Sequence, residues 1–298
     1  MHDQNFKFAG DAVIIVDMSG SMNEAIGAGY PQPTMRKWDA VQESCTAIAK
    51  ELDARDPDGI TVCFFNDSHT VEDHVTGDHV KELFKKYGPR NGTMLAAPLA
   101  TTIDMFIKAP SRETVYADEQ VQKPVYGEQE VDEPVYEDRP KYKTVKVKKG
   151  GFLGMGGTYV DETVPDGTER VQTGTRKVKK QVQTGTTTVT EKVAKGNQIV
   201  KHDPERPVFI AVFTDGAAGD QSQVVRTLVD ATKRISDRKF LGILFVQVGN
   251  DANAAAFLAQ VNNDLGDSGG EHDIVAVVKL EDLEDDTPDQ TIERAFTE

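Results

Sequence analysis

Oxygen-bearing side chains follow two apolar runs of this sequence, at points where a ligand could be held. Asp17, Ser19 and Ser21 lie in the turn Asp17-Met18-Ser19-Gly20-Ser21-Met22, and Asp215 lies in Phe213-Thr214-Asp215-Gly216. Thr93, in Arg90-Asn91-Gly92-Thr93, precedes an expected helix. Two carboxylates and three hydroxyls form an all-oxygen set, which suits a hard cation such as Mg2+ or Mn2+. We expect Mg2+ or Mn2+ rather than Ca2+, and no soft metal.

A plainer interpretation of the same residues stays open. Ser and Thr commonly cap turns and helices through their hydroxyls. Ser19, Ser21 and Thr93 could therefore be local capping residues that hold no ligand.

Apolar periodicity predicts the elements that must position these side chains. Short apolar runs alternate with segments whose apolar residues recur at spacings of three and four. The expected strands are 8–16, 59–65, 69–75, 207–213, 240–248 and 273–278, and the expected helices are 35–54, 78–87, 94–107, 220–237, 253–265 and 282–296. Such alternation predicts an α/β fold with a doubly wound, mostly parallel, Rossmann-like sheet, whose ligands bind beyond the carboxyl ends of its strands.

The middle of the chain has a different composition and period. Residues 110–138 hold nine acidic and two basic side chains, and residues 139–206 hold seven acidic and fifteen basic ones, giving net charges of −7 and +8. Val-Tyr pairs recur every ten residues from Val115, and Val-Gln-Thr-Gly-Thr recurs eleven residues after Val171. We therefore expect a discontinuous domain of residues 1–109 and 207–298, with a β-hairpin-rich insertion at 110–206. A disordered charged linker is the alternative for the insertion.

Composition restricts the environment and the partners. The sequence contains no apolar run long enough for a transmembrane helix, and its start lacks a signal-peptide pattern, so we expect a cytoplasmic protein. Cys45 and Cys63 lie among apolar neighbours, as expected of reduced, buried thiols. A net charge of −15 argues against general nucleic-acid binding. We expect the lysines of the insertion to pair with its acidic strand rather than with nucleic acid.

The five positions Asp17, Ser19, Ser21, Thr93 and Asp215, in this order on alternating strands and helices, resemble the metal-ion-dependent adhesion site of von Willebrand factor A domains. The resemblance implies that Ser19, Ser21 and Thr93 bind the metal directly, with Asp17 and Asp215 acting directly or through water. It also implies an open coordination position for a carboxylate of a protein partner. Bacterial cytosolic relatives imply links to tellurite resistance, stress response or AAA+ ATPase partners.

Two functions follow as expectations. The first is a non-enzymatic protein-binding module that captures a partner carboxylate through its cation, with a second protein partner at the 110–206 insertion. The alternative is a metal-dependent phosphohydrolase. Its aspartyl-phosphate version needs an acid two residues after the nucleophile, where this chain has Ser19, and we expect no basic residue near the Asp17 turn to hold a phosphate.

Overall fold

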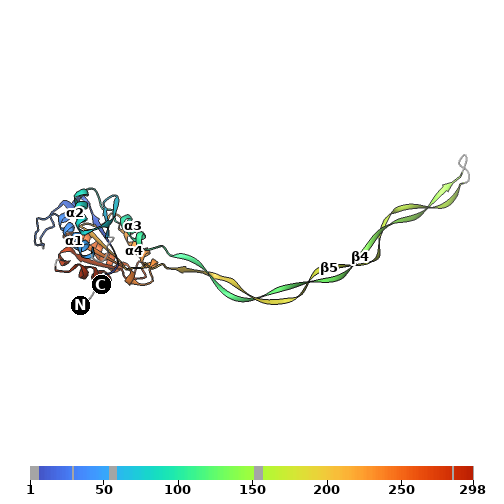
Figure 1. Cartoon of the computed structure of the whole chain (residues 1–298). Coiled ribbons are helices and arrows are strands. Elements are labelled where there is room, and N and C mark those ends of the chain that lie inside the picture. Colours follow the sequence, from blue (N-terminus) through green and yellow to red (C-terminus); the bar gives the residue numbers. More distant parts are fainter. Residues whose placement is uncertain (1–6, 29, 54–58, 151–156, 284, 298) are drawn as a thin grey trace. The chain divides into compact units, whose positions relative to one another are not determined.

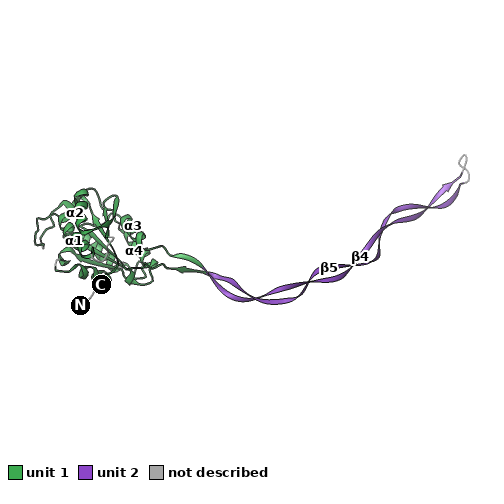
Figure 2. Cartoon of the chain, viewed as in Figure 1, with its two compact units in different colours: residues 1–113, 197–298 green, residues 114–196 purple. Residues whose placement is uncertain are grey.

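The chain forms two compact units in a computed structural model, which describes residues 7–28, 30–53, 59–150, 157–283 and 285–297. Unit 1 combines Met1–Glu113 with Asn197–Glu298, and unit 2 is Thr114–Gly196 (Figure 2). The predicted insertion, 110–206, begins four residues before unit 2 and ends ten residues after it.

Unit 1 is built on a six-stranded sheet in the order β3-β2-β1-β6-β7-β8. Every neighbouring pair is parallel except β2 and β3, which are antiparallel. Apolar runs form the inner strands because both faces of the sheet are covered and every residue of β2, β6 and β7 is buried. The strand bounds are β1 Asp11–Asp17, β2 Ile60–Phe65, β3 His69–Val75, β6 Val208–Thr214, β7 Leu241–Gln247 and β8 Val275–Lys279.

Helices pack on both faces of this sheet (Figure 1). Alternate residues of β1 point to opposite faces, so Ile14 joins one apolar cluster and Ile15 joins the other. The first cluster contains residues of α1 Lys37–Leu52, α2 Gly77–Lys86 and α6 Pro288–Thr297. The second contains residues of α3 Ala96–Phe106, α4 Gln221–Arg234 and α5 Ala252–Asp264. The two cores hold the strand ends, and any side chains beyond them, in place.

The fold-class prediction, a doubly wound and mostly parallel Rossmann-like fold with a β-rich insertion, was wrong. The sheet is mixed, because the three residues between Phe65 and His69 are too few for a crossover and β3 must return antiparallel to β2. Most strand residues also lie outside that sheet. They belong to a separate two-stranded sheet of β4 Ser111–Lys149 and β5 Thr158–Val200.

The two strands β4 and β5 form one long twisted ribbon rather than several hairpins (Figure 1). Ion pairs cross it in antiparallel order, from Glu119 with Lys195 to Glu133 with Arg176. Lys177 and Lys179 pair with Glu130 and Glu128 in the same way. For these lysines, the predicted pairing with the acidic strand is confirmed. Because most of these side chains are exposed, their pairs set the register more than they stabilise the ribbon.

The two sequence repeats meet across the ribbon. The Thr184 hydroxyl donates to the carbonyl of Val125 at 3.2 Å, and that of Thr173 donates to the carbonyl of Val135 at 3.4 Å. Between these contacts β4 advances ten residues and β5 advances eleven. The ten-residue repeat of β4 thus lies opposite the eleven-residue repeat of β5.

Two further findings bear on the environment of the chain. In the part of the chain that the structure describes, no helix is both long enough and apolar enough to span a membrane. Cys45 and Cys63 are buried as free thiols. Burial raises the pKa of both, that of Cys63 to about 12, which keeps them protonated and unreactive.

Candidate functional site

The two candidate aspartates meet at one edge of the central sheet. Asp17 is the last residue of β1, and Asp215 directly follows β6. These strands are parallel neighbours, with Val16 paired to Phe213, so their carboxyl ends coincide. Asp17 is 0% exposed and Asp215 is 2% exposed. Two carboxylates are therefore held close together in a region with little water.

The Asp17 carboxylate is held by its own turn and by β6. Its Oδ1 accepts a hydrogen bond from the Ser19 backbone N–H at 2.7 Å, and its Oδ2 accepts one from the Thr214 hydroxyl at 2.7 Å. Both oxygens thus have fixed positions. Thr214, which sequence reasoning left out of the site, orients Asp17 from the neighbouring strand.

The two serines connect this turn to Asp215. The Ser21 hydroxyl donates to Asp215 Oδ1 at 2.9 Å, and the hydroxyl oxygens of Ser19 and Ser21 lie 3.1 Å apart. Asp17, Ser19, Ser21 and Asp215 therefore form one connected set of oxygens, as the sequence analysis expected from their placement.

The capping interpretation is not supported for two of these hydroxyls. Ser19 is the N-cap of the short 3-10 helix Gly20–Asn23, but its side chain makes no capping hydrogen bond there. Leu95 rather than Thr93 is the N-cap of α3. The Ser19 side chain contacts Ser21 instead of the helix terminus.

Thr93 lies beside the other four residues without joining their hydrogen bonds. Its loop touches the Asp17 turn through Gly20 N–H to Asn91 O at 3.1 Å, and its carbonyl accepts from Gly219 N–H at 2.8 Å. Within the described residues, its hydroxyl makes no hydrogen bond to the other four. The structure therefore brings four of the five predicted residues into contact and places Thr93 in a loop that contacts the Asp17 turn.

Asp220 holds the Thr93 loop in place. It occupies the N-cap position of α4, but its side chain makes no capping bond to α4. Its carboxylate instead accepts from the backbone N–H groups of Leu95 and Ala96 at 3.0 and 2.9 Å, at the start of α3. A carboxylate at a helix N-terminus accepts hydrogen bonds from otherwise unpaired backbone N–H groups, and its negative charge interacts favourably with the positive end of the helix dipole.

Lys37, like Thr214, is a residue at this site that the sequence analysis missed. Its Nζ lies 2.8 Å from Asp215 Oδ2 and 3.2 Å from Glu24 Oε2. Burial by itself would lower the pKa of Lys37, but the hydrogen bonds and negative charges of Asp215 and Glu24 raise it overall. The expectation that no basic residue lies near the Asp17 turn was therefore wrong, because α1 brings Lys37 to Asp215.

Burial changes the pKa of Asp17 strongly. Removal from water raises the pKa of Asp17 to about 6, although hydrogen bonds from Thr214 and Ser19 oppose the increase. The nearby Asp215 charge raises it further. The energetic cost of the charged form makes this carboxylate responsive to a neighbouring cation.

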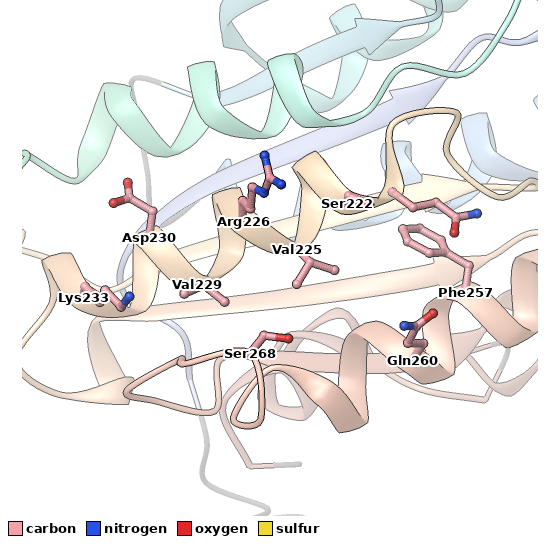
Figure 3. Close-up of a pocket in the computed structure, with 10 residues that line it drawn as sticks. Ser222, Val225, Arg226, Val229, Asp230, Lys233, Phe257, Gln260 and Ser268 are labelled. Atoms are coloured by element: carbon pink, nitrogen blue, oxygen red, sulfur yellow. The ribbon is translucent and has the colours of Figure 1, made fainter.

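A groove that is separate from the candidate site lies elsewhere on unit 1. It is a cavity of 630 Å³ between α4 and α5, where Val225 and Phe257 face each other across the gap (Figure 3). Arg226, Asp230 and Lys233 add charge to its lining. The groove is lined by both polar and apolar side chains and by none of the five candidate residues. We therefore keep the end of β1 and β6 as the candidate functional site.

Comparisons with known proteins identify no family. No protein-family model and no curated protein matches the chain. It is similar to the solved structure of the PilB minor pilin from Streptococcus sanguinis, with 11% identity and a TM-score of 0.42 over 98% of this chain and 64% of that one. The D319A mutant of that pilin matches with 10% identity and a TM-score of 0.39, over 99% and 61%. The chain thus spans less than two thirds of these pilin chains, and TM-scores below 0.5 do not establish a shared fold.

The von Willebrand factor A assignment was therefore wrong. No family model and no curated protein supports it, and within the described ranges no group of three or more His, Cys, Asp or Glu side chains is placed to hold a metal. The description of the five residues as a metal-ion-dependent adhesion site is withdrawn with the family, as are the links to tellurite resistance, stress response and AAA+ ATPases. What remains is the arrangement of the oxygens themselves.

Proposed function

We propose that Asp17, Ser19, Ser21 and Asp215 bind a divalent cation, Mg2+ or Mn2+, and that the bound cation captures a carboxylate of a protein partner. The observation that carries this proposal is the connected set of oxygens on adjacent strand ends. Hard oxygen donors with a net negative charge are what these cations select.

The spacing of the oxygens fits an octahedral ion. With metal–oxygen distances of about 2.0–2.1 Å, adjacent ligands of an octahedron lie about 2.9 Å apart. The Ser21 to Asp215 and Ser19 to Ser21 oxygen distances are 2.9 and 3.1 Å. A cation would replace the hydrogen bonds between these groups without a large rearrangement. Thr93, whose loop contacts the Asp17 turn through Asn91 and Gly20, is proposed as a further ligand, directly or through a water.

The charge of the site favours capture of an acidic group. The two buried carboxylates and the Lys37 ammonium sum to −1, whereas Glu24, the other partner of Lys37, is 69% exposed and its charge is screened by water. A divalent ion therefore leaves the buried cluster with net positive charge. Mg2+ keeps part of its water shell in such sites, and an incoming carboxylate can replace one of those waters. In this role the protein is a binding module and not an enzyme. Its two buried, unpaired cysteines support a reducing, cytoplasmic setting.

The first test is metal binding itself. Asp17→Asn and Asp215→Asn should each weaken Mn2+ binding by about tenfold or more in calorimetric titrations, because each removes a charged oxygen donor. Asp39→Asn is the matched control, since Asp39 lies on α1 but pairs with Arg36 at 2.7 Å. Wild-type protein that binds neither Mn2+ nor Mg2+ would overturn the proposal.

The second test concerns the open coordination position. Bound Mn2+ speeds the relaxation of water protons, and acetate or an oligoglutamate peptide should reduce that effect by displacing a bound water. The same peptide made of glutamine is the control. Metal binding without any effect of carboxylates would refute the capture step alone. Phosphatase turnover that vanishes in Asp17→Ala would instead favour the hydrolase alternative.

A further inference from the structure

The ribbon of β4 and β5 has no core of its own. None of its described residues is buried, and Tyr116, Tyr126, Tyr136, Tyr142 and Tyr159 are all more than 45% exposed. Two strands alone in water are marginally stable, whereas three or more strands stabilise one another. The ribbon would therefore gain stability from an additional strand along one of its edges.

The outer edge of β4 is blocked by prolines. Pro124, Pro134 and Pro140 are separated by even numbers of residues, so their nitrogens lie on the same side of the strand. A proline facing β5 would remove a hydrogen bond of the ladder, so that side is the outer edge. Three missing donors protect this edge against pairing with another chain.

The outer edge of β5 is more open than that of β4. By the same reasoning Pro165 removes one donor from this edge, but β5 contains no proline from residue 166 to residue 200. Its sequence there is rich in Val and Thr, which favour extended pairing. An added strand would therefore pair with β5 rather than with β4.

The charge distribution along β5 selects the strand that fits. Residues 158–169 carry four acidic and no basic side chains, whereas residues 170–200 carry seven basic and one acidic side chain. A second β5 in the antiparallel orientation brings each acidic block beside a basic block. A second β5 in the parallel orientation would bring like charges together, which disfavours pairing.

We propose that β5 pairs through its open edge with the antiparallel β5 of a second copy of this chain, forming a four-stranded sheet. The register that satisfies the charges places Val171 opposite Val171 of the second copy. In that register Glu162 lies opposite Lys180 and Asp166 lies opposite Arg176, each pair occurring twice by symmetry. Over residues 158–184, no like charges are directly opposite. The arrangement is self-complementary and closed, so it ends at a dimer.

The charged residues that would pair in this dimer already have partners on β4 of their own chain. Within one chain, Glu162 pairs with Lys149, Asp166 with Lys143, and both Arg176 and Lys180 with Glu133. In a four-stranded sheet each of these side chains would gain a second neighbour of opposite sign. Backbone hydrogen bonds supply most of the affinity, and the charges choose the orientation and register. The inference is independent of the cation proposed for unit 1.

Charge exchange tests the pairing on the full-length chain. One variant combines Arg176→Glu and Lys180→Glu, and the other combines Glu162→Lys and Asp166→Lys. Each should raise the dimer dissociation constant in sedimentation equilibrium by about tenfold or more, because four attractive pairs become repulsive. An equimolar mixture of the two variants should form a heterodimer that is much tighter than either homodimer, since every charge pair between the two β5 strands is attractive again. That rescue also shows that both variants are folded.

The control variant combines Lys192→Glu and Lys195→Glu, which also reverses two β5 charges but lies beyond the proposed overlap. It should dimerise like the wild type. A Val171→Cys variant should form an intermolecular disulfide on mild oxidation, because the two positions face each other while Cys45 and Cys63 are buried. A wild type that stays monomeric at every concentration, or a dimer that both charge-exchange variants leave unchanged, would overturn the proposal.

Discussion

Replacing Lys37 by Met should lower the free energy of unfolding of the metal-free protein by about 3–5 kcal/mol, the usual cost of removing one partner of a buried ion pair. The side chains of Lys37 and Asp215 are only 11% and 0% exposed. Without the ammonium, Asp215 would stay buried near a second carboxylate, with the Ser21 hydroxyl as its remaining side-chain donor. Urea denaturation in EDTA measures the loss.

Two comparisons separate this effect from a loss of packing. Arg36→Met removes the neighbouring cation, whose exposed pair with Asp39 should contribute at most about 1 kcal/mol. The double variant Lys37→Met with Asp215→Asn removes both charges and should recover much of the lost stability. A Lys37→Met protein as stable as Arg36→Met would show that the buried pair carries no such energy.

The same substitution links stability to the proposed cation. In wild-type protein, Lys37 already pairs with one oxygen of Asp215. A divalent ion bound beside Asp215 therefore adds less to the stability of the wild type. Saturating Mg2+ should therefore restore more stability to Lys37→Met than it adds to the wild type, because a ligand that binds only the folded state stabilises it. Equal stabilisation of both proteins by Mg2+ would argue against a cation beside Asp215.

Asp17 should make the metal-free protein less stable as the pH rises from about 4 to about 6. The carboxyl has a pKa of about 6 when folded, against 3.8 as its ordinary value. Between these values the folded state holds a proton that the unfolded state has lost, so each increase in pH favours unfolding. The difference between the two pKa values corresponds to about 3 kcal/mol, fully lost above the folded pKa.

Asp17→Asn isolates this contribution from that of the other carboxyl groups. Asparagine keeps an acceptor for the Ser19 N–H, and the Thr214 hydroxyl can turn its proton to the Gly216 carbonyl, 3.2 Å away. The difference in unfolding free energy between variant and wild type, followed from pH 4 to pH 7 in EDTA, should change by about 2.4 kcal/mol in favour of the variant, because at pH 4 the unfolded carboxyl has already lost part of its proton. With Asp39→Asn the difference should stay flat. Parallel curves for Asp17→Asn and wild type would contradict the raised pKa.

Local periodicity predicted most elements of unit 1 but not how they are all connected. The runs at 207–213 and 240–248 became β6 and β7 within two residues at each end, because a strand buried on both faces is apolar throughout. The helix expected over 282–296 begins only at Pro288. The antiparallel return of β3 depends on the length of one turn, and the apolar pattern carries no information on strand direction.

For the ribbon, the sequence contains the charges and repeats but not the length of the pairing. Opposite charge blocks predicted which strands attract each other, and the ion pairs of Lys177 and Lys179 agree. A ten-residue and an eleven-residue repeat also fit several short hairpins. Pairing of β4 with β5 along their whole length is a long-range property that neither repeat specifies alone.

At the candidate site, the sequence by itself determined that Asp17, Ser19 and Ser21 share one turn at the end of a buried strand, with Asp215 at the end of another. Only the tertiary structure decided that these strands are neighbours, that Lys37 reaches Asp215, and that Asp220 holds the start of α3. The physical reason is that turns and strand ends depend on consecutive residues. Contacts between residues more than a hundred positions apart depend instead on how the helices and strands pack around two shared cores.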